Sequence, residues 1–145
     1  MSYKIEIKDK PGIFDALGEG IKKDILDLGI SGVEEVRFIQ VYTLEGTFSS
    51  QEITRVCQEI LVDKISQVYS INEPSEYNEP RVFIVEVAYN PGVMDPTQES
   101  TLKAIKDLAI PGATAVKTAK KYVIRGRLND SQLRTISEKL LYNKL

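Results

Sequence analysis

Two pairs of carboxylates in this chain have a spacing that could support chemistry. Asp15 with Glu19, and Asp95 with Glu99, are each four residues apart, so on a helix each pair shares one face. Two carboxylates in that arrangement can chelate Mg²⁺ or act as a general acid and base. Each pair supplies only two ligands, and no phosphate-binding glycine loop accompanies it. We therefore favour a helix-starting aspartate followed by a solvated glutamate at both places.

A line of basic residues is the other candidate for binding. Lys117, Lys121 and Arg125 are spaced by four in a segment that we predict to be a strand, so they share one face, and Arg127 continues the line. Such a stripe could contact phosphates or the acidic surface of a partner. The alternative, which we favour, is a solvated strand face that also contacts the acidic first half of the chain. The one interleaved aromatic residue, Tyr122, points to the other face, which argues against nucleic-acid binding.

The residue types that are absent exclude most catalytic centres. The chain has no histidine, so it cannot form a Ser-His-Asp triad, a Cys-His pair or a histidine metal site. Its single cysteine, Cys57, excludes an internal disulfide and is typical of a reduced cytoplasmic protein. Cys57 lies at helical spacing from Ile53, Val56 and Ile60, which favours a buried small residue over a reactive thiol. We predict a cytoplasmic chain without catalytic, cofactor-binding or metal-binding residues of its own.

The composition is that of a globular protein. Apolar residues make up 42% of the 145 residues and charged residues 28%. No apolar run approaches the roughly 18 residues that a membrane span needs, so we expect no membrane partner. Residues 1–65 contain 8 basic and 12 acidic side chains, whereas residues 81–145 contain 11 and 6. The two halves of the chain therefore face different surroundings.

The chain matches itself at an offset of 80 residues. Without gaps, residues 1–65 align with residues 81–145, and 16 of the 65 pairs are identical. Chance seldom keeps such residues together in register as Pro11/Pro91, Gly32/Gly112 and Tyr42/Tyr122. The segment between the copies has two prolines and three glutamates, which is typical of a linker. We predict a first repeat over 1–71, a linker over 72–80 and a second repeat over 81–145.

Each repeat has the pattern of a strand, a helix, a long extended run and a second helix. The runs 33–45 and 113–125 are either one twisted strand each or two short strands with a bend near Gln40 and Lys120. The last helices should begin after Ser49-Ser50 and after Asn129-Asp130. The first helices carry apolar stripes that should face the core, namely Phe14, Leu17, Ile21, Ile25 and Leu28, and in the second repeat Leu102, Ile105 and Leu108.

The two repeats differ in their strands. In the segment 82–89 both faces are mostly apolar, so we expect this strand to be covered on both sides, by the other copy or by another domain. The alternating residues 66–71 predict a closing strand in the first repeat. The second repeat has no counterpart for it, and we expect this chain to be part of a longer protein. The fold class is α+β, each copy being a sheet with two helices on one face.

These residues resemble a known family. KPGIFDALGEGIKKDI with VEEVRFIQVYTLEG, and YNPGVMDPTQESTLKAI with AVKTAKKYVIRG, are similar to the PurS-type region of phosphoribosylformylglycinamidine synthase. The resemblance covers nearly the whole chain. It implies two tandem PurS-like, ferredoxin-like β-α-β-β-α units that form a pseudo-dimer of antiparallel sheets.

The resemblance also implies a structural role in an enzyme. The family's enzyme, a C–N ligase, carries out the ATP- and glutamine-dependent step from FGAR to FGAM in purine biosynthesis. ATP and Mg²⁺ bind its synthetase domains, and a glutaminase cysteine hydrolyses glutamine. The PurS-type module bridges these two parts, which would be its partners, and helps to shield ammonia in transit.

A regulatory module is the alternative. The strand, Pro-Gly turn and amphipathic helix around Pro11 and Gly12 also resemble a tandem ACT domain, a sensor of amino acids. Such a domain should be stabilised by an amino acid that binds its folded state. A stand-alone enzyme that acts through Asp15 or Asp95 is a third hypothesis, which we do not favour.

Overall fold

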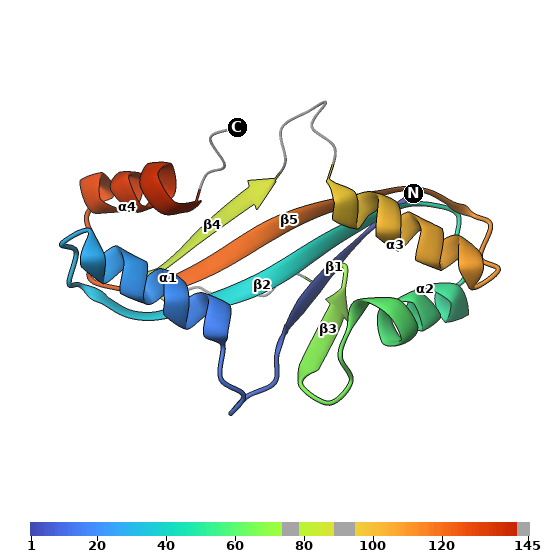
Figure 1. Cartoon of the computed structure of the whole chain (residues 1–145), viewed down its shortest axis with the longest axis horizontal. Coiled ribbons are helices and arrows are strands. Elements are labelled where there is room, and N and C mark those ends of the chain that lie inside the picture. The colour runs from blue at the N-terminus through green and yellow to red at the C-terminus, as the bar shows by residue number, and fades with distance from the viewer. Residues whose placement is uncertain (74–78, 89–94, 142–145) are drawn as a thin grey trace. The chain divides into compact units, whose positions relative to one another are not determined.

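The computed structural model describes residues 1–73, 79–88 and 95–141 (Figure 1). Most of the predicted linker, the predicted Pro-Gly turn at 91–92 and the last four residues lie outside these ranges. None of the helices in the described ranges is long and apolar enough to cross a membrane. The elements are, in chain order, β1 (Ser2–Asp9), α1 (Ala16–Asp27), β2 (Val33–Gly46), α2 (Ser50–Val56), the π-helical segment η1 (Cys57–Leu61), β3 (Gln67–Ile71), β4 (Val82–Ala88), α3 (Pro96–Asp107), β5 (Ala113–Gly126), α4 (Asp130–Ile136) and the π-helical segment η2 (Ser137–Leu141).

The strands form one sheet rather than the two that we predicted. Its order is β3-β1-β2-β5-β4, and β1 runs antiparallel to both of its neighbours. The long runs are each one continuous strand, β2 and β5, so the alternative of two short strands is wrong. Because β2 and β5 are neighbours in the sheet, the strands of the two repeats join across them. A pseudo-dimer of separate sheets therefore does not form.

Two glycines, Gly32 and Gly112, lie at the ends of the pairing between β2 and β5. The Thr47 N–H donates to the Gly112 carbonyl at 3.0 Å, and the Arg127 N–H donates to the Gly32 carbonyl at 2.9 Å. These two hydrogen bonds are equivalent at the offset of 80 residues. A Cβ at Gly32 would collide with the carbonyl oxygen of Arg127, and a Cβ at Gly112 with that of Thr47. Only glycine permits the two backbones to approach this closely.

The chain folds into two compact units, and each unit contains segments of both repeats. The first contains residues 1–13, 40–75 and 88–119, and the second contains residues 14–39, 76–87 and 120–145. The limits between the units lie within β2, after Ile39, and within β5, after Ala119, close to the positions where one of the two alternatives placed a bend. The repeat boundaries 1–71, 72–80 and 81–145 concern the sequence and stay a prediction. The compact units divide the chain differently.

In the first unit, helices from both repeats pack on strands from both repeats. The core combines strand residues such as Ile5 and Leu44 with residues of α2 and η1 from the first repeat. Ile105 of α3 and Val116 of β5, from the second repeat, belong to the same cluster. Its buried members are Ile5, Ile7, Leu44, Phe48, Ile53, Val56, Cys57, Ile105, Ile110, Ala113 and Val116.

The second unit has the complementary composition. Ile25 of α1 and Val36 of β2 come from the first repeat, and they pack with residues of β5, α4 and η2 from the second. Phe83, Val85 and Val87 of β4 pack against this cluster from the sheet side. Its buried members are Ile25, Ile30, Val36, Tyr122, Ile124, Ile136 and Leu141. Neither core can form from one repeat alone.

The second helix of each repeat begins where the sequence predicted. Ser49 caps α2, and a capping box joins it to Glu52. Asn129 caps α4 in the same way, with Gln132 as the second member of the box. The side chains accept from the backbone N–H groups at the helix start, which otherwise lack partners.

The first helix of each repeat ends with a left-handed residue, and this generates a prediction about stability. Gly29 has φ +87°, and Ala109, at the equivalent position, has φ +60°. A side chain is strained in this region, whereas glycine is not. We expect Ala109→Gly to raise the free energy of unfolding by about 0.5–1 kcal/mol and Gly29→Ala to lower it by about 1 kcal/mol. Urea denaturation measures both, and a destabilising Ala109→Gly would contradict this reading.

The environment of Cys57 generates a second prediction. The side chain is fully buried at the start of η1, and burial raises the pKa of its thiol to about 11. The thiol therefore stays protonated and inaccessible at pH 8. We expect Ellman's reagent to react with the native protein at least about a hundredfold more slowly than with the protein in guanidinium. Rapid stoichiometric reaction without denaturant would show that Cys57 is exposed.

Candidate functional site

Asp15 is a structural residue at the start of α1. Its Oδ1 accepts from the Gly18 N–H at 2.9 Å, which caps the helix, and its Oδ2 accepts from the Phe38 N–H at 2.8 Å. The carboxylate thus joins the beginning of α1 to the middle of β2. Both of its oxygens are engaged by backbone donors, so the arrangement stabilises the fold rather than presenting a base to a substrate.

Asp95 plays the same part at the start of α3. It is only 4% exposed. Its Oδ1 accepts from the Thr97 N–H at 2.9 Å, and its Oδ2 accepts from the Thr118 hydroxyl. Thr118 stands at the position of β5 that is equivalent to Phe38 in β2. The interpretation of both aspartates as helix-starting residues is therefore confirmed.

The acidic residues do not assemble into a metal centre in the part of the chain that the structure describes. No group of three histidine, cysteine, aspartate or glutamate side chains gathers there. Glu19 and Glu99 each lie in the first turn of their helix, where the helix dipole stabilises a negative charge.

The predicted basic stripe is partly neutralised by glutamates of the first repeat. Lys117 Nζ lies 3.3 Å from Glu45 Oε1, and Arg125 Nε lies 3.8 Å from Glu35 Oε2. A further ion pair joins Arg125 to Glu79 at 2.9 Å. These contacts are the ones that our alternative interpretation predicts. Each is exposed and therefore contributes only about 0.2–1 kcal/mol.

The other two residues of the stripe differ from each other. Lys121 is 5% exposed, so its ammonium does not lie on an open surface. Arg127 is exposed, and its backbone N–H takes part in the pairing of β5 with β2. The four residues do not form one uniform basic surface, and a partner contact through them stays a prediction.

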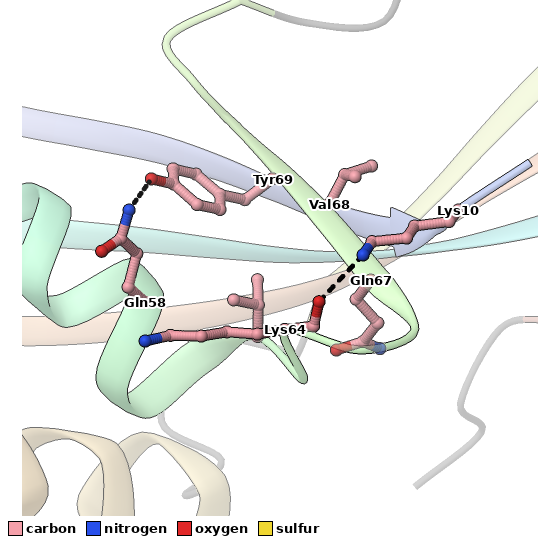
Figure 2. A pocket seen from close by; sticks show the side chains of 7 residues that line it. Lys10, Gln58, Lys64, Gln67, Val68 and Tyr69 are labelled. Atoms are coloured by element: carbon pink, nitrogen blue, oxygen red, sulfur yellow. Dashed lines mark hydrogen bonds between the residues drawn. The ribbon is translucent and has the colours of Figure 1, made fainter.

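A pocket of about 390 Å³ lies between β3, the end of η1 and the loop before β3 (Figure 2). Its walls come from β3, the turn before it, the end of η1 and Lys10, which follows β1. Lys10 Nζ donates to the Lys64 carbonyl at 2.9 Å, and Gln58 Nε2 donates to the Tyr69 hydroxyl at 3.2 Å. The lining residues are Lys10, Gln58, Val62, Lys64, Gln67, Val68 and Tyr69.

The polar side chains of this pocket are suited to binding an anionic group. Two ammonium groups, two amides and a phenol can hold a carboxylate or a phosphate group. The seven lining residues include no carboxylate, thiol or imidazole that could serve as nucleophile or general base. The loop is held by its own hydrogen bonds, because the Gln67 side chain accepts from the Asp63 N–H at 2.9 Å.

The start of α1 presents an apolar surface that our sequence analysis misplaced. We predicted Phe14 and Leu17 on the core face, but Phe14 is 74% exposed and Leu17 is 62% exposed. Ile21 and Ile25, further along the helix, do pack on the core. Phe14 lies before the N-cap Asp15 and therefore outside the helix, and Leu17 lies in its exposed first turn. Comparison of the repeats contained a signal, since Thr97 is the equivalent of Leu17.

The comparisons with known proteins place the chain in a family. Among solved structures, the PurS protein of Methanocaldococcus jannaschii is similar to it, with 21% sequence identity over 49% of this chain and 92% of that chain, and a TM-score of 0.45. That protein is described as one of the subunits of formylglycinamide ribonucleotide amidotransferase in the purine biosynthetic pathway. A search of curated proteins gave no match. The family model of PurS, phosphoribosylformylglycinamidine (FGAM) synthase, matches residues 2–74, and since this is half of the chain, the chain belongs to the PurS family.

Proposed function

We propose that this chain is a non-catalytic PurS-type module of FGAM synthase that bridges the synthetase and glutaminase parts of the enzyme. The observation that carries the proposal is the family match over residues 2–74. The module would act in the ATP- and glutamine-dependent conversion of FGAR to FGAM. By the resemblance, ATP and Mg²⁺ belong to the synthetase part and not to this chain.

The proposal includes two copies of the PurS unit. The family model matches the first copy, and the second copy is supported by hydrogen bonds that recur at the offset of 80 residues. Thr47 to Gly112 corresponds to Arg127 to Gly32, and the Asp15 cap corresponds to the Asp95 cap. Equivalent residues thus perform equivalent structural tasks in both copies.

The lack of a catalytic role is supported by how the polar residues are used. The carboxylates of Asp15 and Asp95 accept hydrogen bonds that hold helix to strand. Burial raises the pKa of the Cys57 thiol, which disfavours the thiolate that a nucleophile requires. The pocket at Lys10 and Lys64 is lined by amine, amide and phenol groups and contains no carboxylate or thiol.

The exposed start of α1 is the surface that we propose for contact with a partner. Phe14 and Leu17, three residues apart in the sequence, both expose large apolar side chains, and aromatic residues such as Phe14 are enriched at protein interfaces. The fold does not require Leu17, because Thr97 holds the same place in the second copy. The basic residues Lys117 and Arg125 are weaker candidates, since glutamates of the same chain already pair with them.

The proposed bridge predicts that the chain binds the enzyme's other parts. The purified chain should form a complex with the synthetase and glutaminase proteins of the same organism, measured by size-exclusion chromatography with light scattering. Free amino acids should leave its melting temperature unchanged, because the proposed bridging role does not involve an amino-acid ligand that stabilises the folded state. A chain that binds neither protein and is stabilised by an amino acid would be an ACT-like sensor instead.

The proposed surface predicts the effect of two substitutions. The double variant Phe14→Ser with Leu17→Thr should weaken binding to the synthetase or the glutaminase protein at least about tenfold, because central apolar contacts commonly contribute more than 1 kcal/mol. Its free energy of unfolding should stay within about 0.5 kcal/mol of the wild type, since both side chains are exposed. Isothermal titration calorimetry measures the affinity. Leu26→Thr is the matched control, because Leu26 is 59% exposed on the same helix, and equal losses in both variants would refute the surface.

A further inference from the structure

We propose that the pocket beside β3 binds an acidic segment of a partner polypeptide. The pocket lies within the first compact unit, and its two charged lining residues, Lys10 and Lys64, are both basic. The proposal goes beyond the bridging function, because it concerns a surface and a ligand chemistry that the family match does not give.

The two ammonium groups of the pocket keep their charge available for a ligand. The Lys10 Nζ donates to the Lys64 carbonyl at 2.9 Å, which is an uncharged backbone group, and two further N–H donors of the ammonium remain. Among the residues that the structure describes, neither lysine forms an ion pair with a carboxylate. Asp63, the acidic neighbour of Lys64 in the sequence, directs its Oδ1 to the Ile65 N–H at 2.9 Å instead. The positive charge of the pocket is therefore complementary to an anionic partner.

The uncharged side chains of the pocket add further donors. The Tyr69 hydroxyl accepts from Gln58 Nε2 at 3.2 Å, so its own proton remains to be donated. The Gln67 amide oxygen accepts from the Asp63 N–H at 2.9 Å, so its NH₂ group is the part that remains for a ligand. The amide oxygen of Gln58 remains as an acceptor, which suits the N–H groups of a polypeptide better than a bare anion.

The two ammonium groups lie on different sides of the pocket. In Figure 2 the Lys10 side chain ends at the Lys64 carbonyl, whereas the Lys64 side chain extends in the opposite direction, towards Gln58. A ligand that contacts both therefore carries anionic groups that are separated along its length. Val62 and Val68 are the apolar residues of the lining and can contact the aliphatic parts of such a ligand. An acidic polypeptide segment has this pattern, whereas a single phosphate or carboxylate has one anionic centre.

An exposed apolar residue beside the pocket favours a polypeptide over a small anion. Ile65 directly follows Lys64 and is 86% exposed. Its loop is fixed, because the Gln67 N–H donates to the Asp63 carbonyl at 2.8 Å and Asp63 also binds the Ile65 N–H. A partner that places an acidic segment in the pocket can cover Ile65 as well, since interfaces combine apolar contacts with charge complementarity. A small anion would leave Ile65 in water.

The second repeat does not retain this charge pattern. At the offset of 80 residues, Lys10 corresponds to Asn90 and Gln58 corresponds to Glu138. A neutral residue in place of a lysine and a carboxylate in place of an amide both reduce complementarity to an acidic segment. The charge pattern is thus a property of the first repeat and not a requirement of the repeated fold.

Binding of a synthetic peptide to the full chain tests the proposal. The probe is acetyl-Glu-Glu-Leu-Glu-Glu-amide, and acetyl-Gln-Gln-Leu-Gln-Gln-amide is the control of equal length without charge. At low ionic strength, the acidic peptide should shift the backbone amide signals of residues 62–69 in NMR spectra, with a dissociation constant below about 1 mM. The neutral peptide should leave these signals unchanged at the same concentrations.

Substitutions separate the pocket from the general charge of the chain. Lys10→Gln with Lys64→Gln should weaken binding of the acidic peptide at least about fivefold. Lys64→Gln alone, which keeps the hydrogen bond from Lys10 to the carbonyl of residue 64, should weaken it at least about twofold. The matched control is Lys103→Gln with Lys106→Gln, because both lysines are exposed on α3 in the same unit and the same charge is removed. It should change the affinity less than about twofold.

Each outcome decides the question. Weaker binding in the pocket variants but not in the control variant supports the site, and unchanged signals elsewhere in the spectra exclude misfolding as the reason. The absence of shifts up to about 5 mM acidic peptide, or equal losses in both double variants, overturns it. Inorganic phosphate that binds at residues 62–69 more tightly than the acidic peptide overturns it in favour of a site for a small anion. The measurements use neither a synthetase nor a glutaminase, so they are independent of the proposed bridging function.

Discussion

The pairing of β2 with β5 is the constraint on which the rest of the structure depends. Each strand is fourteen residues long and contributes to both compact units. Gly32 and Gly112 allow the backbones to approach, since a Cβ at either would strike a carbonyl oxygen of the other strand. Without this pairing the strands of the two repeats could not share a sheet. Neither core would then contain its full set of apolar residues, because each core takes members from both repeats.

The aspartate caps adapt the first helices to this arrangement. A helix that packs with strands of both repeats must be fixed to its long strand, and the side chains of Asp15 and Asp95 do so at equivalent positions. A carboxylate that bonds to helix N–H groups also offsets the helix dipole. The carboxylates of Asp15 and Asp95, which first suggested a catalytic or metal site, therefore hold the first helix of each repeat to its long strand. This structural use of Asp15 and Asp95 is consistent with the non-catalytic role that we propose.

Local chemistry was predictable from the sequence, and long-range pairing was not. The starts of α2 and α4 were predicted from Ser49 and Asn129, because a capping box involves residues only three positions apart in the sequence. Phe14 and Leu17 were misplaced because helical periodicity groups apolar residues on one face but shows neither where the helix begins nor which of these residues the core covers. The single sheet was not predicted, because the residue pattern of β2 and β5 shows that they are strands but not that they pair with each other. The ion pair of Lys117 with Glu45 likewise depends on the pairing of β5 with β2.

Differences between the copies point to function because agreement between them is explained by the fold. Asp15 and Asp95, or Gly32 and Gly112, are retained where the same contact recurs. The difference between Leu17 and Thr97 leaves the cores unaffected, because neither side chain belongs to them. Two identical copies would offer a partner two identical surfaces. The bridge that we propose between a synthetase and a glutaminase would need two unlike surfaces, and divergence at exposed positions on a retained framework is how a repeated unit can acquire them.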